Sequence, residues 1–536
     1  HDHQTPIAII GLDCLFPKSL GLKAYWHLIY QGRDGITDVP ASHWSPEDYF
    51  DPDPRKADHT YCQRGGFLPP IDFDPTEFGL PPNTLEATDT SQLLALVTAK
   101  KALIDAGYGP DRKYDHSRTS VILGVTGTQE LVIPLGARLG FPHWRRAMQH
   151  AGIEAKQCEA IIDDISNAYV SWQESSFPGL LGNVVAGRIC NRLDLGGTNC
   201  VVDAACASSM SALHLGLMEL TCGRSDMVVS GGVDTLNDIF MHMCFSKTHI
   251  LSPTGDIRPF SKNADGTVLG EGIGLLVLKR LDDAQQDGDR IYAVIKGLGS
   301  SSDGKSQSIY APHAQGQARA LRMAYGQAGI DPASVQLLEA HGTGTRVGDR
   351  VEFNALQQVF NASSPPAPWC ALGTVKSMIG HTKAAAGSAG LIKAALALHH
   401  KVLPPTLKVD EPDPDLNLTD SAFYLNTVSR PWPSNQDFPR RAGVSSFGFG
   451  GSNFHAILEE YHPQKAEIVW NDTIDIFALS ADTHAHLKNR IQRLVSELTA
   501  SQNIASTARR IAHTRASFNA HDPYRVLGVV DHNAGS

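Results

Sequence analysis

The sequence has few cysteines, and their spacing matches neither a disulfide framework nor a zinc site. Nine are scattered over 536 residues, and no two have the spacing of a Cys-x-x-Cys pair. An odd number of dispersed thiols gives no disulfide framework, and the missing pairs leave no zinc site. We therefore expect reduced thiols and no bound metal.

Long hydrophobic runs are also missing. The longest apolar stretches, such as residues 274–278, have the length of a strand, and no basic region followed by a signal-length apolar run opens the chain. Because a membrane helix needs about 20 apolar residues, we expect no membrane span. With no secretory signal either, we expect a cytoplasmic protein.

A strong charge of one sign is the third absence. The formal net charge is −10 for 536 residues, and no basic stripe is interleaved with aromatic residues. This pattern argues against a nucleic-acid partner. The 42% of hydrophobic residues suffice for the core of a large soluble enzyme.

One cysteine stands where a strand pattern gives way to a helix pattern. Cys206 lies in the run DAACASS at residues 203–209, directly after the apolar residues 200–202. A helix is predicted downstream, with Gly223 as a candidate C-terminal cap. Because a helix N-terminus favours the thiolate, Cys206 is a candidate nucleophile. Most single cysteines are instead small buried hydrophobes. The apolar residues that recur at helical steps are Met210, Leu213, Leu217 and Leu220.

Two histidines occupy similar positions further along the chain. His341 follows the apolar run 335–340 and opens the glycine-rich loop HGTGT, with Glu352 beyond it. His381 follows the run 371–375, in the sequence KSMIGHTKAAAG that begins at Lys376. Either histidine alone would more often be structural. Together with Cys206, the pair indicates a nucleophilic active site built at strand ends.

At these residues the chain resembles the β-ketoacyl-acyl carrier protein synthases, the ketosynthases of fatty-acid and polyketide assembly. The resemblance covers about residues 5–460 and includes the run SFGFGGSNFH at residues 446–455. The family motifs match residue by residue at Cys206, His341, Glu352, Lys376, His381 and Phe449. The chain departs from the common family pattern, without losing a catalytic group, at Ala204, Ala207, Arg350 and Met378.

Two further stretches suggest a subfamily. TYCQRGGF at residues 60–67 and EFGLPPN at residues 77–83 look most like the first-subunit ketosynthase of bacterial polyunsaturated fatty acid synthases. Enediyne-type and other iterative polyketide synthases share the cysteine run and CFSKT at residues 244–248, so a ketosynthase of that kind is the alternative assignment.

Short apolar strands alternate with helical patterns along the chain, which predicts an α/β fold with parallel pairing. The resemblance implies its form, a thiolase-like fold with a duplicated five-layered αβαβα arrangement. The first half would span about residues 5–285 and the second about 286–460. We interpret residues 108–180, with a predicted helix over 158–172, as an insertion near the dimer interface or the pocket. The strands are predicted at residues 7–11, 120–124, 227–232, 273–278 and 293–297, and a first helix at 25–32.

The pattern changes after residue 460. A strand is predicted over 474–480, an amphipathic helix over 484–498 and, after the run 504–512, a second strand over 524–530. Residues 465–536 resemble the start of the small α/β linker that joins ketosynthase to acyltransferase in type I synthases. We therefore expect this chain to be part of a longer multienzyme.

One motif favours a different class of protein. GSSSDGKS at residues 299–306 satisfies the phosphate-binding pattern GxxxxGK(S/T) and follows a predicted strand. A true phosphate loop starts a helix at its lysine, whereas here helical periodicity starts only near Gln317, so we reject nucleotide binding. His399 and His400 lack a second ligand pair at metal spacing and are interpreted as a solvated helix end.

The resemblance also implies a role for each site residue. Cys206 would accept an acyl group, and its N–H and that of Phe449 would form the oxyanion hole. His341 and His381 would stabilise the enolate from a malonyl unit, with Lys376 and Glu352 in support, or forming a purely structural ion pair. Thr343 and Thr345 would bind pantetheine. Phe447 and Phe449 would form a gate or, alternatively, be core aromatics.

The resemblance implies partners rather than cofactors. The domain would bind no cofactor of its own, because its substrates are carried on the phosphopantetheine of acyl carrier protein domains. An adjacent acyltransferase domain and a second copy of the chain, in a homodimer paired along residues 200–202, are the other expected partners. A degradative thiolase is disfavoured because Cys370 lies outside a catalytic loop. A noncatalytic chain-length scaffold and a decarboxylating loading domain are disfavoured because both usually lack the cysteine.

Overall fold

The computed structural model divides the chain into two compact units, His1–Glu460 and Tyr461–Ser536. The structure describes residues 4–127, 130–305, 308–360, 368–433, 435, 437–461, 474–499, 510–515 and 517–531. Each unit is described separately below.

The first unit contains the same five-strand arrangement twice. In the first half the strand order is β1-β8-β7-β5-β6, and in the second it is β9-β16-β15-β10-β11. In each half the first two pairings are antiparallel and the last two are parallel. The first-half strands are β1 (Ile7–Phe16), β5 (Thr119–Val125), β6 (Asn199–Val202), β7 (Met227–Asp234) and β8 (Gly272–Arg280). The second-half strands are β9 (Ala293–Ser302), β10 (Leu337–Glu339), β11 (Cys370–Gly373), β15 (Arg441–Gly448) and β16 (Ser452–Glu459).

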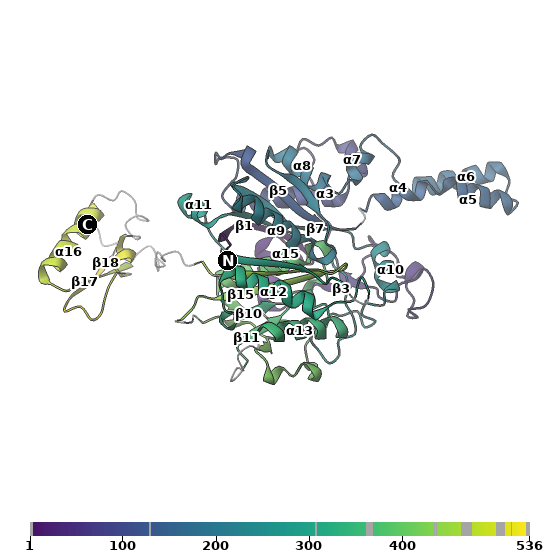
Figure 1. Cartoon of the computed structure of the whole chain (residues 1–536). Coiled ribbons are helices and arrows are strands. Elements are labelled where there is room, and N and C mark those ends of the chain that lie inside the picture. The colour runs from purple at the N-terminus through teal and green to yellow at the C-terminus, as the bar shows by residue number, and fades with distance from the viewer. Residues whose placement is uncertain are drawn as a thin grey trace. The chain divides into compact units, whose positions relative to one another are not determined.

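The two sheets meet along their first strands, where Ile7–Ile9 of β1 pairs antiparallel with β9. Helices complete five layers, as Figure 1 shows. The middle layer holds α9 (Ser208–Thr221) and α15 (Ala386–His400), and the outer layers hold α3 (Thr90–Asp105) with α8 (Val184–Leu193) and α12 (Ala314–Ala328) with α13 (Arg346–Phe360). The predicted thiolase-like αβαβα fold is confirmed.

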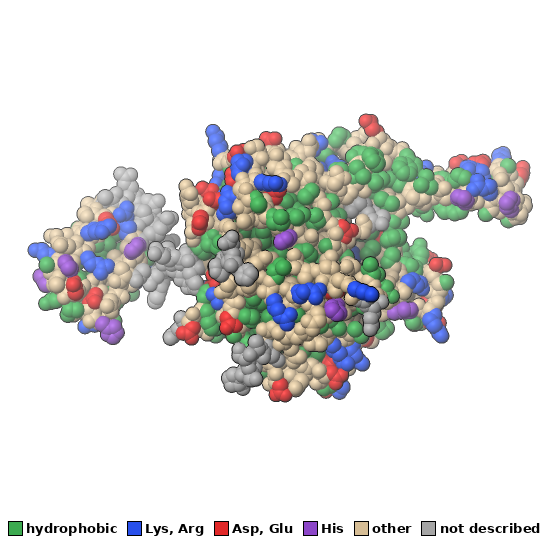
Figure 2. Space-filling view, in the orientation of Figure 1, with side chains coloured by type: hydrophobic (Ala, Val, Ile, Leu, Met, Phe, Trp, Pro, Cys, Tyr) green, Lys and Arg blue, Asp and Glu red, His purple; other side chains and the backbone are tan. Residues whose placement is uncertain are grey.

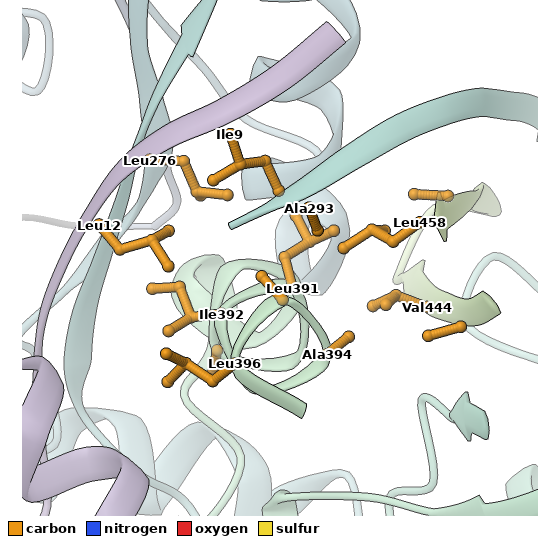
Figure 3. Packing of buried hydrophobic residues seen from close by; sticks show 14 of the residues in the cluster. Ile9, Leu12, Leu276, Ala293, Leu391, Ile392, Ala394, Leu396, Val444 and Leu458 are labelled. Atoms are coloured by element: carbon orange, nitrogen blue, oxygen red, sulfur yellow. The ribbon is translucent and has the colours of Figure 1, made fainter. Parts of the chain in front are cut away.

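The central helix α15 is buried on every side and mostly apolar, and both sheets pack against it. Only its last two residues are exposed, and Ile392 and Leu396 lie in one core with Leu12 and Leu276 of the first half (Figure 3). A helix that is hydrophobic all round belongs in a core. Gly387 allows α15 to approach α9, because a Cβ there would meet Met210 Cγ at 2.6 Å.

The predicted strands of the first unit are present, and the first predicted helix is α1 (Leu22–Gln31), which ends at a left-handed Gly32. The remaining strands and helices are short. They are β2 (Ser19–Leu20), β3 (Ile36–Asp38), α2 (Pro46–Tyr49), β4 (Arg64–Gly66), α10 (Ile239–Lys247), α11 (Leu281–Gln286), α14 (Lys376–Ile379), β12 (Val402–Leu403), β13 (Phe423–Leu425) and β14 (Arg430–Pro431).

The region between β5 and β6 is more helical than its sequence predicts. It forms α4 (Val132–Arg138), α5 (Phe141–His150), α6 (Ala155–Asn167) and α7 (Ser176–Leu180), and α5 and α6 extend away from the sheets (Figure 1). The predicted bounds 158–172 were wrong, since α6 ends at Asn167. The Arg138 guanidinium donates to the carbonyls of Ser166 and Tyr169, each at 2.9 Å, and so satisfies the helix end.

The second unit is a small α/β arrangement. Strands β17 (Ile474–Ala481) and β18 (Tyr524–Asp531) pair antiparallel, and α16 (His484–Thr499) packs on them through Leu487 and Leu494. All three elements match their predicted ranges to within one residue. Residues 465–473 and 504–509 of the predicted linker lie outside the described residues. Within the described part of the chain, no helix combines the length and hydrophobicity that crossing a bilayer requires.

Candidate active site

Cys206 lies in a tight elbow between β6 and α9. A single 3-10 turn, Ala205–Ala207, carries it, and Ala205 has a left-handed φ of 50°. Two side chains hold the elbow: Asp203 accepts from the Ala205 N–H at 2.9 Å, and Ser208 Oγ accepts from the Ala204 N–H at 2.9 Å. The predicted position at a helix start is confirmed, with one extra turn before α9.

The end of β15 is docked against this elbow. Ser446 Oγ donates to the Cys206 carbonyl at 2.8 Å, and the backbone N–H of Phe449 lowers the pKa of the Cys206 thiol. Gly448 permits this approach, because a Cβ there would meet the Ala204 carbonyl oxygen at 2.1 Å. The end of β15 therefore brings a backbone N–H close to the candidate nucleophile.

The helix-start position favours thiolate at Cys206, and burial acts in the opposite direction. Burial raises the pKa of the thiol to about 11, although the positive charges of Lys376 and Lys383 oppose the increase. The helix-start position is therefore outweighed by the cost of placing a thiolate in a buried site.

His341 is held by its backbone rather than by its ring. The Glu352 carboxylate, on α13, accepts from the His341 N–H at 2.7 Å and the Gly342 N–H at 2.8 Å. His341 Nδ1 is buried with no hydrogen-bond partner among the described residues. Its ring lies 5.4 Å from that of His381 and 5.7 Å from that of Phe447, measured between centroids.

His381 is fixed through one ring nitrogen. Its Nδ1 accepts from the Lys383 N–H at 3.1 Å, so a neutral ring carries its proton on Nε2. Burial, with a further contribution from Lys376, lowers the pKa of His341 and of His381 well below the usual value. Both imidazoles are therefore uncharged near neutral pH, and His381 presents an N–H donor.

The supporting residues are arranged differently from a simple ion pair. Glu352 binds two backbone N–H groups, and burial raises its pKa to about 7. Lys376 is buried, which lowers its pKa against the opposing charges of Glu339 and Glu352. Glu339 also forms an ion pair with Lys393 of α15 at 2.5 Å. Glu339 and Lys393 were not among the predicted residues; their signal in the sequence is a charge within an apolar strand or helix.

One cavity of about 700 Å³ brings the candidate residues together. Thr343 and Thr345 lie on its wall with their hydroxyl oxygens 3.0 Å apart. Phe447 is buried, whereas Phe449 is 43% exposed and stacks on Phe245 at 6.2 Å between centroids. Lys376 is buried and is not among the lining residues. The predicted residues that line the cavity are Cys206, His341, Thr343, Thr345, Glu352, His381, Phe447 and Phe449.

The competing motifs occupy other environments. Gly299–Ser302 belongs to β9 and pairs with β16, so no phosphate loop forms at this position, and Ser306 lies outside the described residues. His399 and His400 are exposed at the end of α15. Across the described ranges, no group of three or more His, Cys, Asp and Glu residues is arranged to hold a metal ion.

Comparisons with known proteins agree with this geometry. Three family models match: the β-ketoacyl synthase N-terminal domain at residues 4–284, its C-terminal domain at 292–410, and the ketoacyl-synthetase C-terminal extension at 412–525. The ketosynthase from module 6 of the bacillaene synthase of Bacillus subtilis 168 has a TM-score of 0.73 and 32% identity, covering 98% of this chain and 82% of that one. The oxazolomycin ketosynthase domain OzmH KS7 of Streptomyces albus JA3453 has a TM-score of 0.72 and 30% identity, covering 98% and 86%.

Curated relatives include much longer proteins. A polyunsaturated fatty acid synthase subunit of Thraustochytrium sp. is 43% identical over 468 residues, which is 86% of this chain and 17% of that protein. Polyketide synthase PksN of Bacillus subtilis is 35% identical over 525 residues, 95% of this chain and 9% of that protein. The chain thus spans less than a fifth of either relative. It belongs to the β-ketoacyl synthase family and is a ketosynthase domain of the kind found in polyunsaturated fatty acid and polyketide synthases.

Proposed function

We propose that this domain extends an acyl chain by two carbons through decarboxylative Claisen condensation of a malonyl thioester with an acyl group on Cys206. The observation that carries the proposal is the convergence of one thiol and two uncharged imidazoles on a single cavity. Both substrates would arrive on the phosphopantetheine of acyl carrier protein domains.

In the first step the Cys206 thiolate attacks the acyl thioester carbon. The carbonyl oxygen becomes an oxyanion, and the backbone N–H groups of Phe449 and Cys206 are the two donors for it. The bond to pantetheine sulfur breaks, and the released thiolate takes up the proton that Cys206 has lost. Because burial raises the pKa of Cys206, removal of the thiol proton is part of this step.

In the second step a malonyl thioester loses carbon dioxide. The electron pair of the breaking carbon–carbon bond forms an enolate, whose oxygen carries negative charge. The His381 Nε2–H is held in place to donate to that oxygen, and His341 is the second donor. The enolate carbon then attacks the acyl-Cys206 carbonyl, and the thiolate leaves as the β-ketoacyl thioester forms.

The walls of the cavity suit the delivery of a flexible thioester arm. Thr343 and Thr345 offer hydroxyl groups to pantetheine amides. Phe449 is partly exposed between Gly448 and Gly450, and Gly450 has a φ of 89°, so a rotation of this segment would open or close the route to Cys206 as a gate. Phe447, buried beside His341, would limit how far the acyl chain of the substrate extends into the cavity.

Two features favour a homodimer. The outer edge of β6 is unpaired among the strands of the described residues, and its residues are partly exposed. Exposed apolar side chains also gather over α4 and α7 (Figure 2), including Leu139 and Phe177, with exposed fractions of 66% and 68%. Pairing β6 with its copy would cover an open edge.

The parent protein is proposed to be a cytoplasmic polyunsaturated fatty acid synthase with carrier domains and an adjacent acyltransferase domain. The 43% identity to a synthase subunit of that kind favours it over the polyketide alternative at 35%. An enediyne-type or other iterative polyketide synthase is the second candidate. A noncatalytic chain-length scaffold is disfavoured because Cys206 is present and lines the cavity.

Intact-mass measurement tests the proposal. After incubation with an acyl-pantetheine thioester, the wild-type protein should gain the mass of one acyl group and Cys206→Ala should gain none. Cys370→Ala is the matched control, since that thiol is buried away from the cavity. Acyl transfer to another residue of the wild-type protein would overturn the assignment.

A further inference from the structure

A buried ion pair joins the first half of the fold to the loop that carries His381. Lys383 Nζ lies 3.0 Å from Asp234 Oδ1, at the end of β7, and donates to the Gly270 carbonyl at 2.8 Å. Lys383 and Asp234 have exposed fractions of only 2% and 5%. The pair was not among the predicted site residues.

The same carboxylate also holds the backbone of this loop. Asp234 Oδ2 accepts from the Ala384 N–H at 3.2 Å, within the 3-10 turn Lys383–Ala385. The turn lies directly against β7, because a Cβ on Gly232 would meet the Ala384 carbonyl oxygen at 2.4 Å. Asp234 therefore fixes both the side chain and the backbone around Lys383.

The backbone of Lys383 has a strained conformation that directs its N–H toward His381. Its φ of 46° is left-handed, which disfavours any residue other than glycine. In this conformation its N–H points back to His381 Nδ1 at 3.1 Å. A strained residue persists only where its surroundings determine it, and here they are the contacts with Asp234 and Gly270.

We propose that Lys383, clamped by Asp234, is a positioning residue that keeps His381 uncharged with its Nε2–H directed to the cavity. The inference rests on the proposed function, because it assigns Lys383 a role through the enolate donor His381. A purely structural ion pair would stabilise the loop without controlling the protonation of the imidazole.

The positive charge of Lys383 also affects the protonation of His381. A cation near an imidazole disfavours imidazolium, and Lys383 contributes in this direction to the lowered pKa of His381. Burial raises the pKa of Asp234 to about 6, so it is mostly ionised at pH 7 and moderates the effect. Lys376 lowers the pKa of His381 in the same direction, and Asp238 and His242 also interact with the charge of Lys383. The charged or titratable residues that line the cavity are Cys206, His249, Asp265, Asp303, Tyr310, His341, Arg346, Glu352 and His381.

Opposite substitutions separate the two roles. Removing the cation in Lys383→Met should raise the pKa of His381, so the acidic limb of malonyl-pantetheine decarboxylation should move to higher pH by about one unit. Removing the anion in Asp234→Asn should leave that limb unmoved or shift it to lower pH. A structural pair would give lower rates in both variants without moving the limb of Lys383→Met to higher pH.

The controls address folding and the proposed function. Lys279→Met is the matched control. Lys279 is also buried, lies near the end of β8 and forms an ion pair with Asp289 at 2.8 Å. This variant should have a lower melting temperature but the same acidic limb of decarboxylation as the wild-type protein. If Lys383→Met does not fold, the double variant Lys383→Met/Asp234→Asn removes both charges, and its limb should lie at higher pH than that of Asp234→Asn.

The outcomes remain distinguishable. If His381→Ala retains full decarboxylation, the proposed function of His381 fails. If His381→Ala is impaired but the acidic limb shifts in the same direction in Lys383→Met and Asp234→Asn, or does not shift in either, only the role of Lys383 is overturned.

Discussion

The two halves of the fold end their equivalent strands differently. β6 of the first half leads to Cys206, whereas β11, its counterpart in the second half, leads to Lys376 and His381. β10, the counterpart of β5, leads to His341. One duplicated arrangement thus carries the proposed nucleophile in one copy and the two proposed hydrogen-bond donors in the other.

The same strands also differ in how their outer edges are covered. β13 pairs in parallel with β11, and all four β11 residues are buried. β6 has no such strand within the described ranges, and its residues are partly or fully exposed. The second half is therefore closed within the chain, while the first half leaves an edge that another molecule can cover.

Removing the nucleophile should give the largest effect and test the first half of this comparison. Cys206→Ala should lower condensation by on the order of 1000-fold or more, since Cys206 is the only cysteine among the described residues that line the cavity. The assay is formation of β-ketoacyl product from acyl- and malonyl-pantetheine. The melting temperature should change little, because alanine fits the space of the thiol; retained turnover would contradict the assignment.

The histidine variants test the second half. His341→Ala and His381→Ala should each lower malonyl decarboxylation by about 100-fold or more, as expected for loss of an oxyanion donor. Acylation of Cys206, followed by intact mass, should persist in both. His455→Ala is the control, because His455 is buried on β16 and bonds Ser445 rather than the cavity. A variant that lost acylation and decarboxylation equally would argue against the division of roles.

The sequence predicted most of this arrangement, because strand ends carrying Cys206, His341 and His381 have strong local patterns. It could not predict Lys383 with Asp234, or Glu339 with Lys393, because each pair joins residues more than 50 positions apart and depends on how the layers stack. It could not show how far burial opposes thiolate at Cys206, since burial depends on the whole fold. The α6 end at Asn167 was missed because its cap, Arg138, lies on another helix.

Alkylation should compare two thiols, one from each half. With a Cys206 pKa of about 11, the rate of its modification by iodoacetamide should rise about tenfold per pH unit between pH 7 and 10, following the thiolate fraction. Cys370, buried in β11 and outside the cavity, should stay unmodified in the folded protein. Exposed Cys222 and Cys244 are replaced by serine beforehand. A plateau below pH 8 would show that thiolate is favoured after all.

A substitution on the open edge of β6 should give the smallest numerical effect, a twofold change in the mass of the assembly. It tests whether a second copy of the chain covers this edge. Light scattering of the wild-type protein should report two chains of 57.8 kDa each. In Val201→Glu, carboxylates placed on β6 would face each other across a twofold axis, and like charges on paired strands are destabilising, so the variant should be a monomer. Met323→Glu, on the exposed face of α12 in the closed half, should remain a dimer.

Two results would contradict this prediction. If Val201→Glu also remained a dimer, the two copies would meet through another surface, and the exposed apolar side chains over α4 and α7 would be the next region to change. A fully active wild-type monomer would mean that no second copy covers the open β6 edge.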